Sequence, residues 1–158
     1  MQFIDEDLID KVSIQLGTSE EARTAAIQAL ETEQPILLAY LFSENFDAFL
    51  AHEKEYILFL VIVIIEAVKQ STEQPIPLIT EETLSNAEEA NWEKITQVKA
   101  QRFRERLDVF FKDTPQEDLL AFIEDALIDE EDGLLSKEGR EPIFVVLKSI
   151  VDAIATIS

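Results

Sequence analysis

Apolar and polar residues alternate along most of this chain with the period of an α-helix. Near the start, Leu8, Ile9, Val12 and Leu16 are spaced so that one face of a helix over residues 5–16 would carry all four side chains. Comparable stripes recur to the end of the sequence, where the last helix opens between residues 136 and 142. The pattern predicts an all-α fold: a compact single-domain bundle of about six or seven helices around a central apolar helix.

Capping boxes predict where two of these helices begin. Thr18 and Glu21 have the spacing at which a hydroxyl and a carboxylate satisfy the free amide groups of a first helical turn. Thr114 and Glu117 repeat this spacing, and Pro115 stands between them at the position that suits a proline. We therefore expect helices to start at Thr18 and at Thr114.

Prolines and a threonine predict two further helix starts and the clearest connection between helices. Pro35 occupies a favourable first helical position, with an apolar stretch behind it. Pro75 and Pro77 forbid a helix in residues 70–80 and favour an extended path there. Thr80 can cap the helix that follows, which we expect to extend as far as residue 112, with a break near residue 91.

One short segment occurs twice. Residues 32–36 read Thr-Glu-Gln-Pro-Ile, and residues 72–76 repeat them forty positions later. Forty residues is close to the period of helical HEAT-type pairs, but little else agrees between the two copies and Pro77 interrupts the second. Coincidence is the better interpretation.

The longest apolar run extends from Tyr56 to Ile65 and is closed by Glu66. Its ten residues are too few to cross a bilayer, which takes about 20, so the run belongs in the protein core. Because it is apolar on all sides, we predict that it forms the central helix. The β-branched residues 61–65 would also suit a buried strand, but only residues 76–79 and 143–147 are remote candidates for its partners.

Composition agrees with this fold and disfavours two classes of partner. The 158 residues suit one domain, 1–158, and three glycines and five prolines are too few for the many turns of an all-β fold. The 33 acidic residues against 13 Lys and Arg give a net charge of −20, which would repel nucleic acids and anionic membranes. The first residues are acidic rather than basic and apolar, so no secretory signal is recognised and we expect a cytoplasmic protein.

The sequence lacks the residues of common catalytic and metal sites. There is no cysteine, and the only histidine is His52. A zinc peptidase helix would need a second histidine at Tyr56, and a di-iron helix would need a glutamate at Phe49. Without a glycine-rich loop or a serine elbow, we predict no catalytic residue, no metal and no cofactor, and a protein that is not an enzyme.

Acidic residues offer two weaker candidates for a site. Residues 129–133 read Asp-Glu-Glu-Asp-Gly, but alignment with a calcium-binding EF-hand loop puts Ile128 and Gly139 where carboxylates are required. We interpret this cluster as a solvated helix end. Glu66 and Asp152 lie within apolar helical stretches, and we expect each to face solvent at a helix edge.

Residues 92–112 carry an unusual positive charge. Six Lys and Arg residues against three acids give +3, while the rest of the chain carries −23. On a helix, Lys99, Arg102 and Arg106 would share one face, with Trp92 nearby. The first interpretation is that this segment neutralises acidic neighbours within the fold. The second is a partner-binding stripe, formed by Trp92, Lys99, Arg102 and Arg106, for an anionic ligand or an acidic segment of a partner.

These observations favour a non-enzymatic protein–protein interaction or regulatory module that binds through a helical groove or through the basic stripe. The alternative is an enzyme or ligand-binding regulator with a pocket of carboxylates and arginines. A third hypothesis, an acidic mimic of nucleic acid, depends on net charge alone. The sequence does not indicate the partner, the biological process or the oligomeric state.

Overall fold

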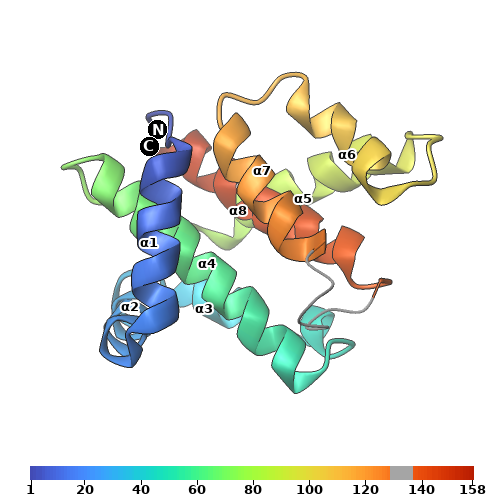
Figure 1. Ribbon diagram of the computed structural model, residues 1–158. Coiled ribbons are helices and arrows are strands. Elements are labelled where there is room, and N and C mark those ends of the chain that lie inside the picture. Colours follow the sequence, from blue (N-terminus) through green and yellow to red (C-terminus); the bar gives the residue numbers. More distant parts are fainter. Residues whose placement is uncertain (129–136) are drawn as a thin grey trace.

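The computed structural model describes residues 1–128 and 137–158, and within them the chain is helical, with no β-strand (Figure 1). The described residues form eight α-helices and one short 3₁₀ helix: α1 (Glu6–Thr18), α2 (Glu20–Glu33), α3 (Pro35–Leu41), η1 (Glu44–Phe46), α4 (Ala51–Ser71), α5 (Glu81–Thr96), α6 (Phe103–Phe111), α7 (Glu117–Ile128) and α8 (Arg140–Ile157). The predicted all-α bundle is confirmed.

The structure has more helices than the expected six or seven because the segment from residue 80 to residue 112 forms two. α5 ends at Thr96, residues 97–102 form a connection, and α6 begins at Phe103. The break expected near Asn91 is wrong: Asn91 is buried within α5. The basic residues of this segment are therefore divided between two helices and the connection that joins them.

Side-chain caps begin several helices, in part at the predicted residues. The hydroxyl of Thr80 accepts a hydrogen bond from Thr83 N, and the carboxylate of Asp5 accepts one from Leu8 N. The start at Thr18 is wrong by one residue, since α1 continues through Thr18 and the hydroxyl of Ser19 caps α2.

The second predicted capping box is also displaced. α7 begins at Glu117, so Thr114 lies in the preceding turn, where its hydroxyl accepts a hydrogen bond from Gln116 N at 3.0 Å. The same short polar side chain thus stabilises a turn instead of a first helical turn. Pro35, in contrast, begins α3 as predicted.

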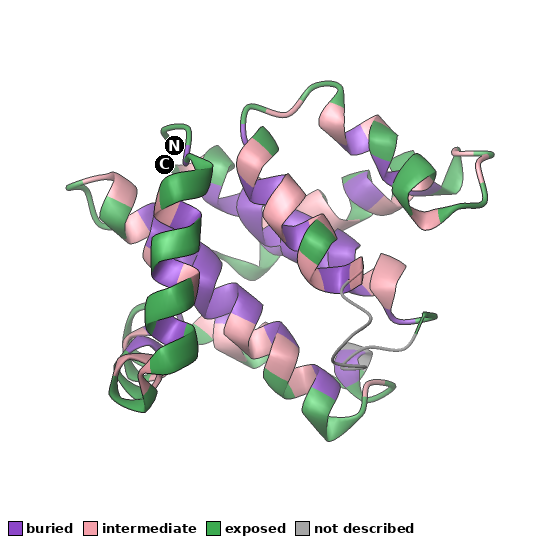
Figure 2. Ribbon diagram, in the orientation of Figure 1, coloured by how far each residue is buried: buried purple, intermediate pink, exposed green. Residues whose placement is uncertain are grey.

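Two long helices supply the centre of the core (Figure 2). In α4, every side chain from Leu60 to Ile65 is buried, and these residues are helical, so the alternative of a buried strand is wrong. In α8, residues 143–151 are all buried, which makes α8 a second central helix. α7 and α5 pack on α8, and α1 packs on α4. Of the helices described, none combines the length and apolarity needed to cross a membrane.

The two copies of the repeated pentapeptide have different structures. The first copy ends α2 and begins α3, whereas the second lies in the extended connection after α4. Gln34 of the first copy is buried, and its side chain donates to the carbonyls of Ile76 and Pro77 and accepts from Ile79 N. The amide of Gln34 therefore holds the extended segment against the bundle, and the copies are not equivalent structural units.

Candidate functional site

The four residues predicted to bind a partner lie in different settings. Trp92 is half-buried in α5, Lys99 is exposed in the connection, and Arg102 is exposed at the N-terminal cap of α6. Arg106 lies in α6 and is partly buried. Because Lys99 is outside a helix, the helical face predicted for Lys99, Arg102 and Arg106 does not form.

Arg106 is engaged within the fold. Its Nε and Nη2 atoms donate to the two carboxylate oxygens of Glu141 on α8, each at 3.0 Å. The same guanidinium donates to the carbonyls of Ile95, Val98 and Ala100 at 2.9–3.2 Å. The planar guanidinium group can form two parallel hydrogen bonds with a carboxylate. Here it also donates to carbonyls at the C-terminal end of α5 and just after it. The hydrogen bond with Glu141 raises the pKa of Arg106 above its usual range.

Arg104 reaches the acidic side chains of α7. Its guanidinium lies 3.3 Å from Glu124 Oε1 and 3.6 Å from Asp125 Oδ1. Burial raises the pKa of Glu124 above 4.5, and the nearby carboxylates of Asp125 and Asp108 raise it further, against the opposing effect of Arg104. Arg104 and Arg106 thus support the first interpretation of the basic segment, in which its cations pair with acidic neighbours.

The other four cations of this segment have no acidic partner among the described residues. Lys94, Lys99, Arg102 and Lys112 are exposed and form no ion pair within residues 1–128 and 137–158. Whether Lys99 and Arg102 bind an acidic partner stays a prediction.

Trp92 also has a role inside the fold. Its indole Nε1 donates to Glu88 Oε1 at 3.3 Å, and the other oxygen of Glu88 accepts a short hydrogen bond from the hydroxyl of Tyr40 on α3. Burial, followed by the hydrogen bond and the charge of Glu88, raises the pKa of Tyr40 above its ordinary value. Glu88 therefore joins α3 to α5 through two aromatic side chains.

Other residues singled out in the sequence fall outside any site or outside the described residues. His52 is exposed in the first turn of α4. Glu66 is half-buried and pairs with Lys69 at 3.4 Å, so it does not simply face solvent. The acidic cluster at 129–133 lies outside the described residues.

Asp152 has a partly buried environment as well. Its Oδ2 atom accepts from Asn91 at 2.9 Å and from Lys148 at 2.7 Å, and Asn91 also donates to Ser149. The Lys148 ammonium lies 5.3 Å from the centre of the Phe110 ring. These polar groups join α5, α6 and α8, and Asp152 is 39% exposed at their edge.

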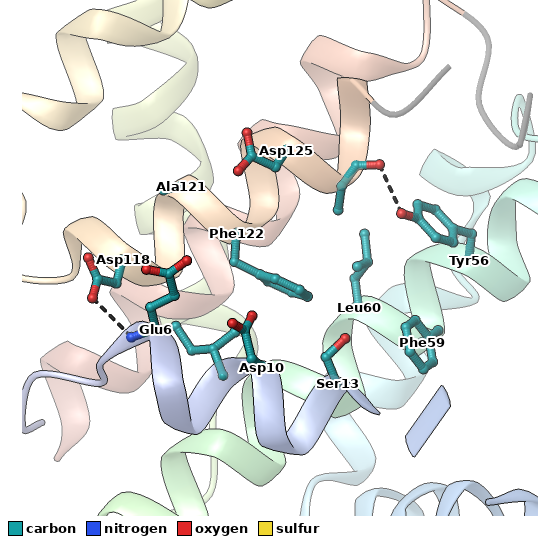
Figure 3. Close-up of a pocket in the computed structure, with 12 residues that line it drawn as sticks. Glu6, Asp10, Ser13, Tyr56, Phe59, Leu60, Asp118, Ala121, Phe122 and Asp125 are labelled. Carbon is teal, nitrogen blue, oxygen red and sulfur yellow. Dashed lines mark hydrogen bonds between the residues drawn. The ribbon is translucent and has the colours of Figure 1, made fainter. Parts of the chain in front are cut away.

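A groove lies between α1, α4 and α7 (Figure 3). It encloses about 420 Å³ and is lined by Glu6, Ile9, Asp10, Ser13, Tyr56, Phe59, Leu60, Asp118, Ala121, Phe122, Asp125 and Ala126. α1 and α7 form the two sides, and the ring of Phe122 extends from α7 toward the middle of the groove. Tyr56 donates to the carbonyl of Ala126 at 2.8 Å and so ties α4 to α7 at one end.

The groove combines an apolar interior with an acidic rim. Glu6 and Asp10 stand on α1, and Asp118 and Asp125 stand on α7 (Figure 3). Asp118 Oδ2 accepts a hydrogen bond from Glu6 N at 3.0 Å, which holds the start of α1 against α7 but supplies no positive charge. Among the residues that the structure describes, no Lys or Arg lines the groove, and Arg104, 61% exposed, reaches its edge through Asp125.

A second cavity of about 370 Å³ lies where α6 and α8 meet the turn before α7. Its charged lining consists of Lys94, Asp113, Lys148 and Asp152. Lys148 is 8% exposed and is already paired with Asp152. Opposite charges are therefore balanced in this cavity, in contrast to the groove.

Neither region offers a metal centre. Within the ranges 1–128 and 137–158, no three His, Cys, Asp or Glu side chains are grouped so that they could hold a metal ion. The sequence matches no protein-family model, and comparisons with curated proteins and with solved structures found no similar protein.

Sequence reasoning missed the groove. Glu6, Ile9, Asp10 and Ser13 follow the i, i+3, i+4, i+7 spacing of one helical face, and Asp118, Ala121, Phe122 and Asp125 do the same. Each pattern places carboxylates beside apolar residues, which is a weak signal in a chain with 33 acids. The contact between α1 and α7 joins segments 112 residues apart, and no local pattern predicts it.

Proposed function

We propose that this chain is an acidic, non-enzymatic interaction module that binds a partner protein in the groove between α1, α4 and α7. The observation that carries the proposal is an apolar interior beside four carboxylates, which in the described part of the chain pair with no cation other than Arg104. A groove in which half-buried aromatic side chains lie beside unneutralised carboxylates is a site that a complementary protein surface can cover.

The basic residues of 92–112 give weaker support for binding. Arg106 and Trp92 are used by contacts within the fold, so the predicted stripe is reduced to Lys99 and Arg102. Two exposed cations by themselves contribute little binding energy, because exposed ion pairs are worth at most about 1 kcal/mol.

A ligand-binding regulator or enzyme is the second candidate, and the cavity at Lys148 favours it. A lysine that is 8% exposed beside a carboxylate could position a small polar molecule. The Lys148–Asp152 pair, its contact with Phe110 and the bonds of Asn91 satisfy these groups within the protein, however, which is what a structural network requires. The groove is the stronger site.

Recovery of the partner from the native host tests the proposed function. The tagged protein would be purified after mild crosslinking, and the recovered partner would be purified and titrated against three forms of the chain. These are the parent, a groove variant with Asp10→Asn and Asp118→Asn, and a control with Glu31→Gln and Glu89→Gln, two exposed acids outside the groove.

Both double variants change the net charge by the same amount, so a general loss of acidity affects them equally. We expect the groove variant to bind the partner several-fold more weakly and the control to bind as the parent does. Equal binding by the groove variant, or recovery of the chain alone after crosslinking, would contradict the proposal.

A further inference from the structure

The two sides of the groove are helical faces of matched length. On α1, the lining residues extend from Glu6 to Ser13, and on α7 from Asp118 to Ala126. At 1.5 Å per residue, these faces measure about 10–12 Å, or roughly two helical turns. A site of this length fits a short rod-like segment lying along the two helices better than it fits a flat surface.

The chemistry of the groove changes across its width. Aromatic and aliphatic side chains, Phe59, Leu60 and Phe122, line the interior, while carboxylates stand on both sides. A ligand complementary to this arrangement has an apolar strip along its middle and positive charges along both edges. An α-helix has that pattern when apolar residues recur at i, i+3, i+4 and i+7 and Lys or Arg flank them.

We propose that the occupant of the groove is a basic amphipathic helix of the partner protein, with its apolar stripe on the half-buried rings of Phe122 and Phe59 and its cations facing both acidic sides. This inference rests on the proposed function and names the partner's chemistry. Long Lys and Arg side chains can cover the apolar edge with their methylene stems while their charged ends reach carboxylates.

Arg104 acts as an internal competitor in this arrangement. It comes from α6, outside the groove lining, and its guanidinium lies 3.6 Å from Asp125 Oδ1 on the rim. An incoming cation would replace Arg104 at Asp125. Because Arg104 is 61% exposed, it can turn toward solvent or keep its contact with Glu124 without rearrangement of the helices.

Synthetic peptides test the inference with the whole chain. The first probe is a capped, fluorescein-labelled peptide of eighteen residues, with leucines at i, i+3, i+4 and i+7, lysines and arginines beside them, and alanines elsewhere. The second probe has the same composition in scrambled order, which removes the apolar stripe but keeps the charge. Spermine serves as a cation without a helical face, and affinity is followed by fluorescence anisotropy at low and moderate salt.

We expect the amphipathic peptide to bind more tightly than the scrambled one, and unlabelled spermine to displace it only at much higher concentration. Asp10→Asn with Asp118→Asn should weaken binding about fivefold or more, while Glu31→Gln with Glu89→Gln should change it less than about twofold. Arg104→Gln should strengthen binding about two- to fivefold, whereas Lys99→Gln, which changes the net charge equally, should not.

Equal binding of the scrambled peptide, or displacement by spermine at comparable concentration, would overturn the inference, because charge alone would then explain the affinity. No binding of the amphipathic peptide to the parent would overturn it as well. In each of these cases the proposed function is decided separately, by whether the partner recovered from the native host depends on Asp10 and Asp118.

Discussion

The basic segment at 92–112 and the acidic groove each concentrate charges of one sign. They differ in how far those charges are paired within the protein. In the basic segment, Arg106 makes five hydrogen bonds to Glu141 and to three carbonyls, and Arg104 pairs with Glu124 and Asp125. In the groove, four carboxylates surround an apolar interior, and within residues 1–128 and 137–158 only Arg104 pairs with one of them. Two arginines of the basic segment are thus paired inside the molecule, whereas within the described ranges the groove carboxylates have no cation near them apart from Arg104.

This difference follows from the overall composition. Because 33 acids stand against 13 Lys and Arg, most carboxylates cannot pair with a cation, whereas Arg104 and Arg106 both find carboxylates close by. A local excess of charge in a sequence is therefore a poor indicator of a binding site when the rest of the chain carries the opposite sign. An unneutralised charge beside exposed apolar surface is a better one.

The largest expected effect comes from Arg106. Arg106→Met should lower the free energy of unfolding by about 2–3 kcal/mol, because Glu141 loses its partner and three carbonyls lose their donor. Urea denaturation measures the change. A loss below about 0.5 kcal/mol, the range of ordinary surface substitutions, would show that the arginine is not structural. Peptide binding to the groove should be unchanged in this variant.

Glu124 gives a smaller effect that depends on pH. Its pKa in the folded protein is raised above 4.5, so protonation stabilises the fold, and this contribution is lost as the pH rises through the folded pKa. Glu124→Gln should therefore raise the melting temperature at pH 7, and the difference from the parent should disappear as the pH falls below 4.5. A lower melting temperature at pH 7 would mean that the pair with Arg104 outweighs the cost of burial.

Neutralising the groove should have a slight stabilising effect. Asp10→Asn with Asp118→Asn relieves repulsion among the rim carboxylates, and the side-chain amide introduced in place of the Asp118 carboxylate can still accept the hydrogen bond from Glu6 N. We expect a gain of a few tenths of a kcal/mol, to about 0.5 at low salt, which shrinks as salt screens the charges. A clear loss of stability would show that these carboxylates stabilise the fold and do not form a binding site.

The smallest effect is expected for the exposed cations. Lys99→Ala with Arg102→Ala should change the free energy of unfolding by no more than about 0.5 kcal/mol, since neither side chain forms an ion pair within the described ranges. The same variant should bind the amphipathic peptide as the parent does. Loss of partner binding in it would restore the predicted basic stripe as the interaction site.

Those features of the fold that depend on neighbouring residues could be predicted from the sequence. Pro35 and Thr80 begin helices because a fixed φ angle and a capping hydroxyl act within one turn. The run from Tyr56 to Ile65 lies in a central helix because a segment that is apolar on all sides favours burial on all sides, which residues 60–65 achieve. Thr18 and Ser19 both carry a hydroxyl that can cap a helix, and the predicted start of α2 is wrong by one residue there.

Features that depend on distant residues could not be predicted. The end of α5 is fixed in part by Arg106, whose partner Glu141 lies 35 residues further along the chain. The groove exists because α1 and α7 pack side by side, and Asp118 meets the amide of Glu6 across most of the sequence. Hydrophobic periodicity shows which face of each helix is buried but not which helix it packs against.

Site-specific photo-crosslinking in the native host tests most directly that the groove, and not the basic segment, contacts the partner. A photoreactive benzoylphenylalanine would replace Ser13 inside the groove, Lys99 in the basic connection, or Ile14, which is exposed on α1 beside the groove lining. We predict a partner adduct from the Ser13 position, and none from Lys99 or Ile14. An adduct from Lys99 with none from Ser13 would contradict the assignment of the groove as the binding site.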